Sequence, residues 1–391
     1  MDFSPATLTL HSLLEDRLKF RVERDVLAEA VAWAARTLPT RPSLPVLAGV
    51  VLDATSGSLQ LSSFDYEVSA RVDVSADVDE PGRVLVSGRL LADIARSLPA
   101  QPVVMQTDGT RVTITCGRST FALPTLPVED YPQLPAMPGV AGSVPSDVFA
   151  AAVAQVAIAA GRDDTLPTLT GVRMEIDGST IVLAATDRYR LAVREFSWTP
   201  TSSSISATAL VPAKTLSDAA KSLAGGDSVS IALTPDAEGL IGFEGEGRRS
   251  TTRLLDGEFP KYRSLLPNES STVASVDTQA LIDAVKRVAL VAERNTPVRL
   301  TFDGSEVSLR AGAGDDAQAS EVVESVTEGD VIEIAFNPGY LIDGLAAINS
   351  PVARFSFTQS TRPAVITGVS DVSAASSDAY RYLLMPVRLT G

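Results

Sequence analysis

Residues 44–50 read Leu-Pro-Val-Leu-Ala-Gly-Val, and residues 166–172 read Leu-Pro-Thr-Leu-Thr-Gly-Val, 122 positions later. A second pair keeps the same spacing: Asp-Val-Leu-Ala-Glu-Ala-Val at 25–31 and Asp-Val-Phe-Ala-Ala-Ala-Val at 147–153. Two motifs that share one offset are hard to obtain by chance. The chain therefore contains an internal repeat, and a repeat sets the fold before any single element does.

Other segments extend this repeat to a third copy. A helix-like segment recurs at intervals of 125 residues, at 86–93, 211–218 and 336–343, and a third copy of the helix that begins at Asp25 and Asp147 lies at 277–292. The chain thus consists of three related units, each of about 120–130 residues and so within the usual size of a domain. Proline-rich stretches mark the boundaries, and we expect an N-terminal extension and three domains at 1–16, 17–138, 139–268 and 269–391.

Each unit has the same predicted order of elements. Apolar residues at helical spacing predict a first helix at the start of each unit, with Asp25, Asp147 and Asp277 placed to cap it or favour its dipole. The pairs Asp177-Gly178 and Asp303-Gly304 lie between alternating apolar runs and predict hairpins, whose central residues need positive φ. A second helix follows at 89–98, 213–223 and 338–348, and then more strands. We expect an α+β fold with two helices packed on antiparallel sheet in each unit.

Composition limits the class of protein. The chain has 391 residues, 45 % of them hydrophobic, with one cysteine (Cys116), one histidine (His11) and a net charge of −15. One cysteine excludes a disulfide scaffold, and one histidine nearly removes His-dependent catalysis. Neither a signal peptide nor a membrane-spanning segment is evident, so we expect a cytoplasmic protein that does not meet a membrane. The acidic balance argues against broad affinity for phosphates.

Catalytic motifs are weak throughout the sequence. Residues 245–249 superficially suggest a phosphate-binding loop but lack a following helix, so a hairpin turn is the better interpretation. The acidic pairs at 163–164 and 315–316 have no third ligand at useful spacing and are expected to be solvated loop charges. Cys116 alternates with apolar residues and is expected to be a packed strand thiol. We find no nucleophile–base pair, and we expect no enzyme, cofactor or metal site.

Positive charge recurs at matching places in the units. Arg89 aligns with Lys214 and Arg96 with Lys221, and in each second helix the two cations lie two turns apart, on similar faces. Further cations lie on the third unit's first helix and in the turns after the first helices: Lys286, Arg287, Arg41, Arg162 and Arg294. For any one of them, a solvated helix cation is the simpler interpretation, but recurrence favours a shared role for the set.

Three motifs point to a family. Residues 185–193 (Ala-Thr-Asp-Arg-Tyr-Arg-Leu-Ala-Val), 256–263 (Asp-Gly-Glu-Phe-Pro-Lys-Tyr-Arg) and 382–389 (Tyr-Leu-Leu-Met-Pro-Val-Arg-Leu) are similar to those of the bacterial DNA polymerase III β subunit, the sliding clamp. The resemblance covers residues 17–391 and includes the three-unit plan. It implies the DNA clamp fold, in which two three-domain chains close head to tail into a ring with helices lining the hole. The cations named above would then face the DNA, whose backbone carries no sequence information.

The resemblance also implies a pocket for short peptide motifs of partner proteins, with apolar walls that suit Leu and Phe anchors. Its matching residues are Leu169, Thr186, Arg188, Tyr189, Arg190, Leu191, Pro260, Ser264, Leu265, Pro363, Leu383, Met385, Pro386, Val387 and Arg388. Without the resemblance, Leu169, Leu191 and Leu265 would be assigned to the core. Arg188, Tyr189 and Ser264 depart from common family residues, and Thr390 and Gly391 extend the usual C-terminus.

The implied ring interface and partners complete the prediction. Phe121 and Leu123 would form an apolar edge strand that meets Ala289 and Leu290 of a second copy. The implied function is that of a processivity factor, a nucleoid-associated homodimer that encircles double-stranded DNA. Its implied partners are the DNA polymerase III catalytic subunit, the clamp loader, translesion polymerases, ligase and mismatch-repair proteins. Two alternatives stay open: a non-catalytic repeat scaffold that never meets DNA, and an enzyme with a carboxylate site.

Overall fold

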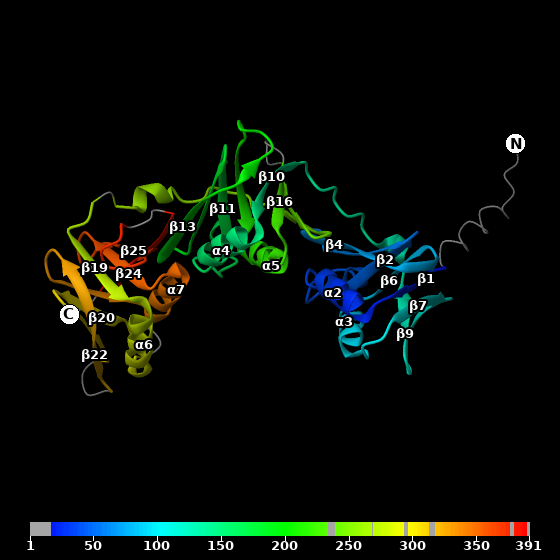
Figure 1. The fold of residues 1–391 in the computed structure, drawn as a ribbon, viewed down its shortest axis with the longest axis horizontal. Helices are drawn as coiled ribbons and strands as arrows, with labels where there is room; N and C mark the ends of the chain where they lie inside the picture. The colour runs from blue at the N-terminus through cyan, green and yellow to red at the C-terminus, as the bar shows by residue number, and fades with distance from the viewer. Residues whose placement is uncertain are drawn as a thin grey trace, which may run out of the picture. The chain divides into compact units, whose positions relative to one another are not determined.

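The structure, a computed structural model, describes residues 17–233, 239–267, 269–292, 296–312, 317–375 and 379–388. Within these residues one order of elements occurs three times: a strand, a helix, a run of strands, a second helix and three closing strands. The three copies follow one another along the chain (Figure 1). The three-unit α+β plan predicted from the sequence is therefore present.

The first copy consists of β1 (Lys19–Val22), α2 (Arg24–Ala35), η1 (Pro45–Ala48), β2 (Gly49–Thr55), β3 (Ser58–Phe64), β4 (Val68–Ser75), β5 (Asp77–Glu80), β6 (Gly82–Ser87), α3 (Gly88–Ser97), β7 (Val103–Asp108), β8 (Arg111–Cys116), β9 (Ser119–Leu126) and η2 (Val128–Asp130). The second consists of β10 (Val140–Pro145), α4 (Ser146–Ala157), η3 (Pro167–Thr170), β11 (Gly171–Asp177), β12 (Thr180–Thr186), β13 (Arg190–Ser197), β14 (Thr199–Pro200), β15 (Ser206–Pro212), α5 (Ala213–Leu223), β16 (Ser228–Leu233), β17 (Leu240–Gly245), β18 (Arg248–Arg253) and η4 (Tyr262–Leu265). The third consists of β19 (Thr272–Asp277), α6 (Thr278–Val288), η5 (Ala289–Val291), β20 (Val298–Asp303), β21 (Glu306–Ala311), β22 (Ala319–Glu328), β23 (Ile332–Phe336), α7 (Pro338–Ile348), β24 (Val352–Phe357), β25 (Ala364–Val369) and β26 (Tyr380–Leu384).

The start of each copy differs from the prediction, because a short strand precedes the first helix. The predicted capping aspartates also behave differently from one another. The Asp277 side chain accepts a hydrogen bond from the Ala280 amide at 2.7 Å and is a true N-cap. Asp25 instead lies inside the first turn of α2 and pairs with Arg24 at 2.9 Å.

The hairpins lie where predicted, with a different loop composition. Asp177 pairs with Thr180 as the last strand residue, so the two-residue loop is Gly178-Ser179 and only Gly178 has a positive φ, of 53°. The prediction that both residues of the Asp-Gly pair adopt positive φ is therefore wrong. The turn within 245–249 is a hairpin between β17 and β18, as expected, and there both central residues have positive φ.

The chain divides into two compact units: Met1–Ser146 with Lys221–Arg253 (unit 1), and Asp147–Ala220 with Leu254–Gly391 (unit 2). In unit 1, β18 of the second copy pairs antiparallel with β4 of the first. In unit 2, β26 of the third copy pairs antiparallel with β13 of the second. Sheets thus continue from one copy into the next, which is why three repeats give two compact units.

The helices of each unit cover one face of its sheet. In unit 1, α2 packs on α3 and on β4, and in unit 2, α6 packs on α7 (Figure 1). Alternation along the strands turns apolar side chains toward these helices, and Cys116 on β8 is fully buried, as predicted. No helix among the described residues is long and apolar enough to cross a membrane.

Candidate functional site

A tight turn between β12 and β13 positions the central residues of the candidate site. The Asp187 carboxylate accepts hydrogen bonds from the amides of Tyr189 and Arg190, at 3.0 and 3.1 Å. The Thr186 hydroxyl donates to the Arg190 carbonyl at 2.7 Å. Arg188 has a φ of 79°, in the left-handed region, and the turn exposes it together with Tyr189. Local polar bonds therefore fix the two side chains that project from this turn.

Helix α7 forms the facing wall. Asn337 caps the helix by accepting a bond from the Tyr340 amide at 3.2 Å, and Pro338 takes the first helical position. The ring of Tyr340 stacks on the ring of Tyr189, with centroids 6.2 Å apart. The two walls come from different repeats of the chain, and their aromatic rings meet.

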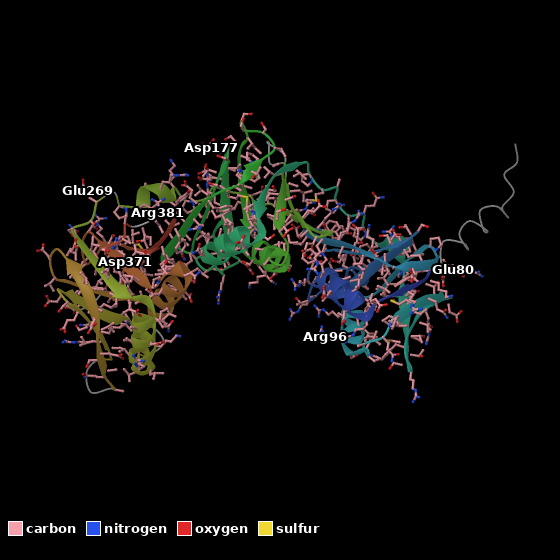
Figure 2. The ribbon with its side chains drawn as sticks, in the orientation of Figure 1. Glu80, Arg96, Asp177, Glu269, Asp371 and Arg381 are labelled. Atoms are coloured by element: carbon pink, nitrogen blue, oxygen red, sulfur yellow. The ribbon has the colours of Figure 1, made fainter. Side chains whose placement is uncertain are left out.

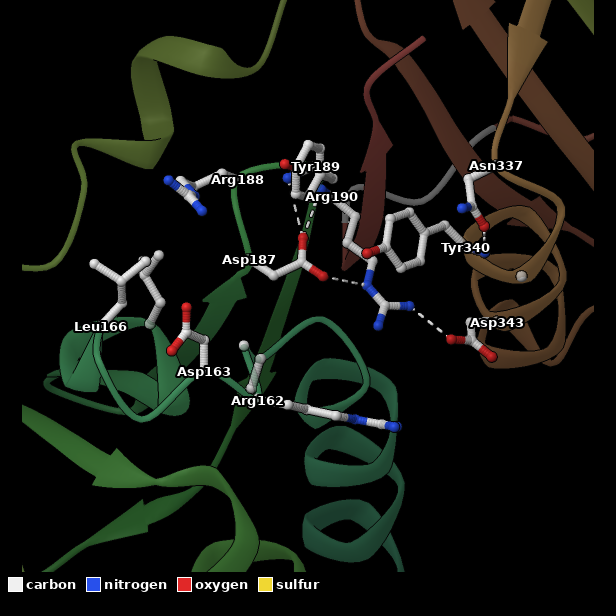
Figure 3. Close-up of a pocket in the computed structure, with 14 residues that line it drawn as sticks. Arg162, Asp163, Leu166, Asp187, Arg188, Tyr189, Arg190, Asn337, Tyr340 and Asp343 are labelled. Carbon is white, nitrogen blue, oxygen red and sulfur yellow. Dashed lines mark hydrogen bonds and ion pairs between the residues drawn. The ribbon is translucent and has the colours of Figure 1, made fainter. Parts of the chain in front are cut away.

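Arg190 lies between these walls, with only 5 % of the residue exposed. Its guanidinium pairs with Asp187 at 2.9 Å and with Asp343 at 2.6 Å, and its Cζ lies 4.3 Å from the Tyr340 ring centroid. Figure 3 shows the side chain reaching from the turn toward α7. Burial would lower the pKa of Arg190, but Tyr382, Asp343 and Asp187 outweigh it and raise that pKa above its ordinary value.

These elements enclose a cleft of about 560 Å³, a size that suits a ligand side chain or a short peptide. Four residues predicted for the peptide pocket line it: Leu169, Arg188, Tyr189 and Arg190. Further lining residues are Ala160, Gly161, Arg162, Asp163, Leu166, Asp187, Asn337, Gly339, Tyr340 and Asp343. Arg162 was predicted to face DNA, yet it lines this cleft (Figure 3).

Helix α7 is not among the pocket walls predicted from the sequence. The repeat instead predicts residues 336–343 as a third copy of a helix whose other copies carry cations. A signal was present, because Asn-Pro-Gly-Tyr replaces the cationic start found in the other two copies. An aromatic residue and an N-cap at that place distinguish this helix from its counterparts.

Other predicted pocket residues lie outside the cleft. Pro260 and Ser264 line a second cavity of about 610 Å³, and Leu265 and Pro363 line a third of about 330 Å³. Within the second cavity, the Glu175 carboxylate accepts hydrogen bonds from Arg173 and Tyr262 and pairs with Arg263. The residues predicted for one pocket therefore line three separate cavities of unit 2.

Three predicted pocket residues are buried in the core. Leu191 and Leu383 are directly opposite in the β13–β26 ladder and pack with Phe259 and Tyr262, and Thr186 is 4 % exposed. These side chains are covered in the free chain, because the cross-strand pair carries the core from one repeat into the next, and their assignment as pocket walls stays a prediction. For Leu191 the core alternative holds, whereas Leu265 is 49 % exposed.

The C-terminal segment lies beside the turn and along β23. The Met385 amide donates to the Tyr189 carbonyl at 2.9 Å, and the Val387 amide donates to the Ala335 carbonyl at 2.8 Å. The side chains of Met385 and Val387 stay exposed, and Pro386 is half-buried beside the exposed Arg388. Thr390 and Gly391 lie outside the described residues.

The predicted DNA-facing cations are exposed wherever the structure describes them: Arg41, Arg89, Arg96, Arg162, Lys214, Lys221, Lys286 and Arg287. Arg96, labelled in Figure 2, lies in the last turn of α3. Arg287 differs from the others, because it forms a bidentate pair with Glu321 on β22 at 2.5 and 3.0 Å. Arg294 lies outside the described residues, as do His11 and the acidic pair at 315–316.

The predicted interface residues are not equally available. Phe121 is 36 % exposed on β9 and Leu290 is 84 % exposed on η5, beside the half-buried Ala289. Leu123 is only 2 % exposed, so its assignment to an exposed apolar edge is wrong. Phe121 and Leu123 share one face of the strand. The core covers Leu123, whereas Phe121, which is nearer the β8–β9 hairpin, stays exposed.

The repeated α+β units, sheets that run on between repeats and exposed cations on their helices define a clamp-like architecture. Comparisons with known proteins agree with it. Family models for the N-terminal, central and C-terminal domains of the DNA polymerase III beta subunit match residues 18–135, 143–261 and 263–388. The chain belongs to the DNA polymerase III beta subunit family, and its function is that of a DNA sliding clamp.

Individual relatives give the same result. The beta sliding clamp of Streptomyces coelicolor is 64 % identical, over 96 % of this chain and 100 % of the relative. Among solved structures, the DNA polymerase sliding clamp of Bacillus subtilis is 26 % identical with a TM-score of 0.88, over 95 % of this chain and 100 % of that chain. A DnaN sliding clamp from Pseudomonas aeruginosa bound to griselimycin is 28 % identical, with a TM-score of 0.88 over 95 % of this chain and 100 % of that chain.

Proposed function

We propose that two copies of this chain close head to tail into a ring that encircles duplex DNA. The supporting observation is the strand pairing between repeats. The last strand of the second copy, β18, pairs with the fourth strand of the first, β4, and β26 of the third copy pairs in the same way with β13 of the second. By the same pattern, the last strand of the first copy, β9, would pair with the fourth strand of the third copy, β22, of a second chain.

Both remaining strands have an edge to offer. In β9, residues 119–124 pair with β8, and pairing to β6 begins only at Thr125. In β22, residues 319–324 pair with β21, and pairing to β19 begins at Ser325. Exposed Phe121 on β9 and exposed Val322 on β22 add apolar surface to these edges. Such edges invite association, and a head-to-tail contact closes when the rotation permits.

Within the ring, the exposed helix cations would neutralise DNA phosphates without reading the bases. A closed ring is held by topology, so a chain with a net charge of −15 needs no tight grip on DNA. We infer that Arg89, Arg96, Lys214 and Lys221 act in this way. Arg287 contributes less, because Glu321 compensates its charge.

The surface around the cleft is proposed to take peptide motifs of partner proteins. Four of the residues predicted for it are large, apolar or aromatic, and exposed: Tyr189, Leu265, Met385 and Val387. The Met385 amide bonds the Tyr189 carbonyl, so these two exposed side chains lie side by side at the cleft, and exposed apolar side chains that adjoin mark an interaction surface. The proposed partners are the polymerase catalytic subunit, the clamp loader, translesion polymerases, ligase and mismatch-repair proteins, met in the cytoplasm at the nucleoid. The proposed role is not catalytic. The proposed domain boundaries lie at 138/139 and 268/269.

The decisive experiment tests for a topological link. The chain is loaded onto a nicked circular plasmid by a clamp loader, isolated by gel filtration, and the plasmid is then linearised. We expect the protein to be retained on circles and lost from linear DNA. Phe121→Asp is a matched variant, because charging the β9 edge should give monomers by light scattering and no retention on circles. Retention after linearisation would reject the topological link, and failure to load would favour a protein scaffold.

A further inference from the structure

The cleft has two walls that are far apart in sequence, and one buried side chain joins them. The turn at residues 187–190 belongs to the second repeat, and helix α7 belongs to the third. The Arg190 guanidinium contacts Asp187 on the first wall and Asp343 on the second. Its two carboxylate partners lie on opposite sides of the cleft, as the dashed lines in Figure 3 show.

The two arms of this contact differ in exposure. The Asp187 side chain is 13 % exposed and also holds the turn through its backbone hydrogen bonds. The Asp343 side chain is 48 % exposed, and within the described part of the chain it does not hold the turn. A buried arginine holds its partners in fixed geometry through its planar fork. A substitution of Asp343 can therefore break its ion pair with Arg190 while the hydrogen bonds of Asp187 still hold the turn.

Tyr382 on β26 also holds helix α7 in place. Its ring is fully buried, and its hydroxyl donates to the Tyr340 carbonyl at 2.8 Å. The ring fits only because residue 344 is glycine, since a Cβ there would lie 2.3 Å from the Tyr382 ring. The backbone of α7 is thus fixed at Tyr340 by β26 and at Asp343 by Arg190.

The counterparts in other repeats lack this bridge. By the 122-residue offset, position 190 corresponds to Val68, and by the 125-residue interval, position 343 corresponds to Asp218 and Asp93. Asp93 is exposed and pairs with the cation of its own helix, Arg96, at 3.7 Å. Val68 carries no charge, so among the described residues this bridge belongs to the junction of the second and third repeats.

We propose that Arg190 is a positioning residue, a latch that fixes the separation of the turn and α7 so that a partner peptide meets a preformed cleft. The inference rests on the proposed peptide-binding function of this surface. A latched wall keeps the Tyr189 and Tyr340 rings stacked in the bound and free states, so binding pays no ordering cost there. Loosening the latch should shorten the lifetime of the complex more than it slows encounter.

The test uses Asp343→Asn, which removes the charge of the exposed arm and keeps its size. Binding of a labelled polymerase-derived peptide with Leu and Phe anchors is measured by surface plasmon resonance on the intact protein. We expect the dissociation rate to rise about fivefold, with the association rate within about twofold of wild type. Asp343→Glu should restore most of the lifetime, and Asp93→Asn, the matched change on α3, should alter neither rate.

A second measurement separates the latch from the peptide site. Amide hydrogen exchange of Tyr189 and Arg190 is followed without peptide, and Asp343→Asn should speed it about tenfold while exchange in unit 1 stays unchanged. Unchanged exchange in Asp343→Asn would overturn the latch, as would a wild-type peptide lifetime. If the wild-type protein fails to bind the peptide, the proposed function is rejected, and the exchange result alone decides the latch.

Discussion

The turn at residues 65–68 and the turn at residues 187–190 share one backbone at two junctions between repeats. In each, an aspartate accepts bonds from the amides two and three residues on: Asp65 at 3.0 and 2.7 Å, Asp187 at 3.0 and 3.1 Å. Tyr66 and Arg188 both lie in the left-handed region, with φ of 77° and 79°. A carbonyl of each turn also accepts a hydrogen bond of 2.9 Å from the next repeat. The Arg253 amide donates to the Glu67 carbonyl, and the Met385 amide donates to the Tyr189 carbonyl.

The side chains at the two junctions differ in chemistry. At the first, the cross-strand pair is Ser69–Thr251, with hydroxyls 2.6 Å apart, and Val68 begins the strand. At the second, the matching pair is Leu191–Leu383, and Arg190 begins the strand. The comparison teaches that the repeat supplies a common backbone, and that a few side chains give the second junction its ion pair and its proposed binding site.

The largest expected effect comes from removing the charge that distinguishes the second junction. Arg190→Met leaves Asp187 buried without its partner and should lower the free energy of unfolding of unit 2 by about 3 kcal/mol. Urea unfolding is followed by Trp198 fluorescence in a Trp33→Phe background. The matched change at the first junction, Val68→Met, should cost less than about 1 kcal/mol by Trp33 fluorescence. Equal losses at both junctions would contradict the contrast.

The repeats and most of the helices could be predicted from the sequence. The offsets of 122 and 125 residues gave the repeats, and α5 and α7 begin and end where expected, at Ala213–Leu223 and Pro338–Ile348. These predictions succeed because apolar periodicity and helix caps are local in sequence. The short opening strands were missed because four to six residues leave little alternation to detect.

The cleft itself needed the fold. Nothing local to Asp343 indicates that Arg190, 153 positions earlier, will bury its guanidinium against it. Leu123 and Leu191 look equally apolar in sequence, and only the covering of each strand decides that both are buried. Contacts between repeats are long-range and leave no local pattern. The sequence therefore predicts the helix that contains Tyr340 and Asp343 only as a copy of a cationic helix, not as a wall of the cleft.

A second difference between the junctions is the position of the buried phenols that respond to alkali. Tyr131 at the first junction is buried, and its hydroxyl accepts from the Phe64 amide at 2.7 Å. Burial raises the pKa of Tyr131 to about 12, against about 10 in the unfolded chain. The unfolded chain therefore ionises first, so this stabilisation is complete below pH 10 and is lost as pH rises from 10 to 12. The matching residue at the second junction is Phe259, which has no phenol, but burial raises the pKa of the nearby Tyr262 to about 12 as well.

Unit 1 should thus lose roughly 2 kcal/mol between pH 10 and 12 through Tyr131 alone. The measurement is urea unfolding at steps across this range, followed by Trp33 fluorescence in a Trp198→Phe background. Tyr131→Phe should be less stable at pH 8, because the Phe64 amide loses its acceptor, yet lose less stability on raising the pH. Parallel pH curves for the two proteins would refute the role of Tyr131.

The smallest effect tests the shared backbone. A residue other than glycine in the left-handed region is strained, so glycine at either turn should relieve strain worth about 0.5–1 kcal/mol. At Arg188 no ring contact opposes that gain, and Arg188→Gly should raise the melting temperature of unit 2 by about 2 °C. At Tyr66 the ring lies 5.7 Å from Phe64, and losing this contact should cancel the gain. Melting curves of the two variants compare the turns directly, since the backbone term is common and only the side-chain term differs. A fall in melting temperature for Arg188→Gly would mean that Arg188 stabilises its turn, and the equivalence of the two turns would then be limited to their hydrogen bonds.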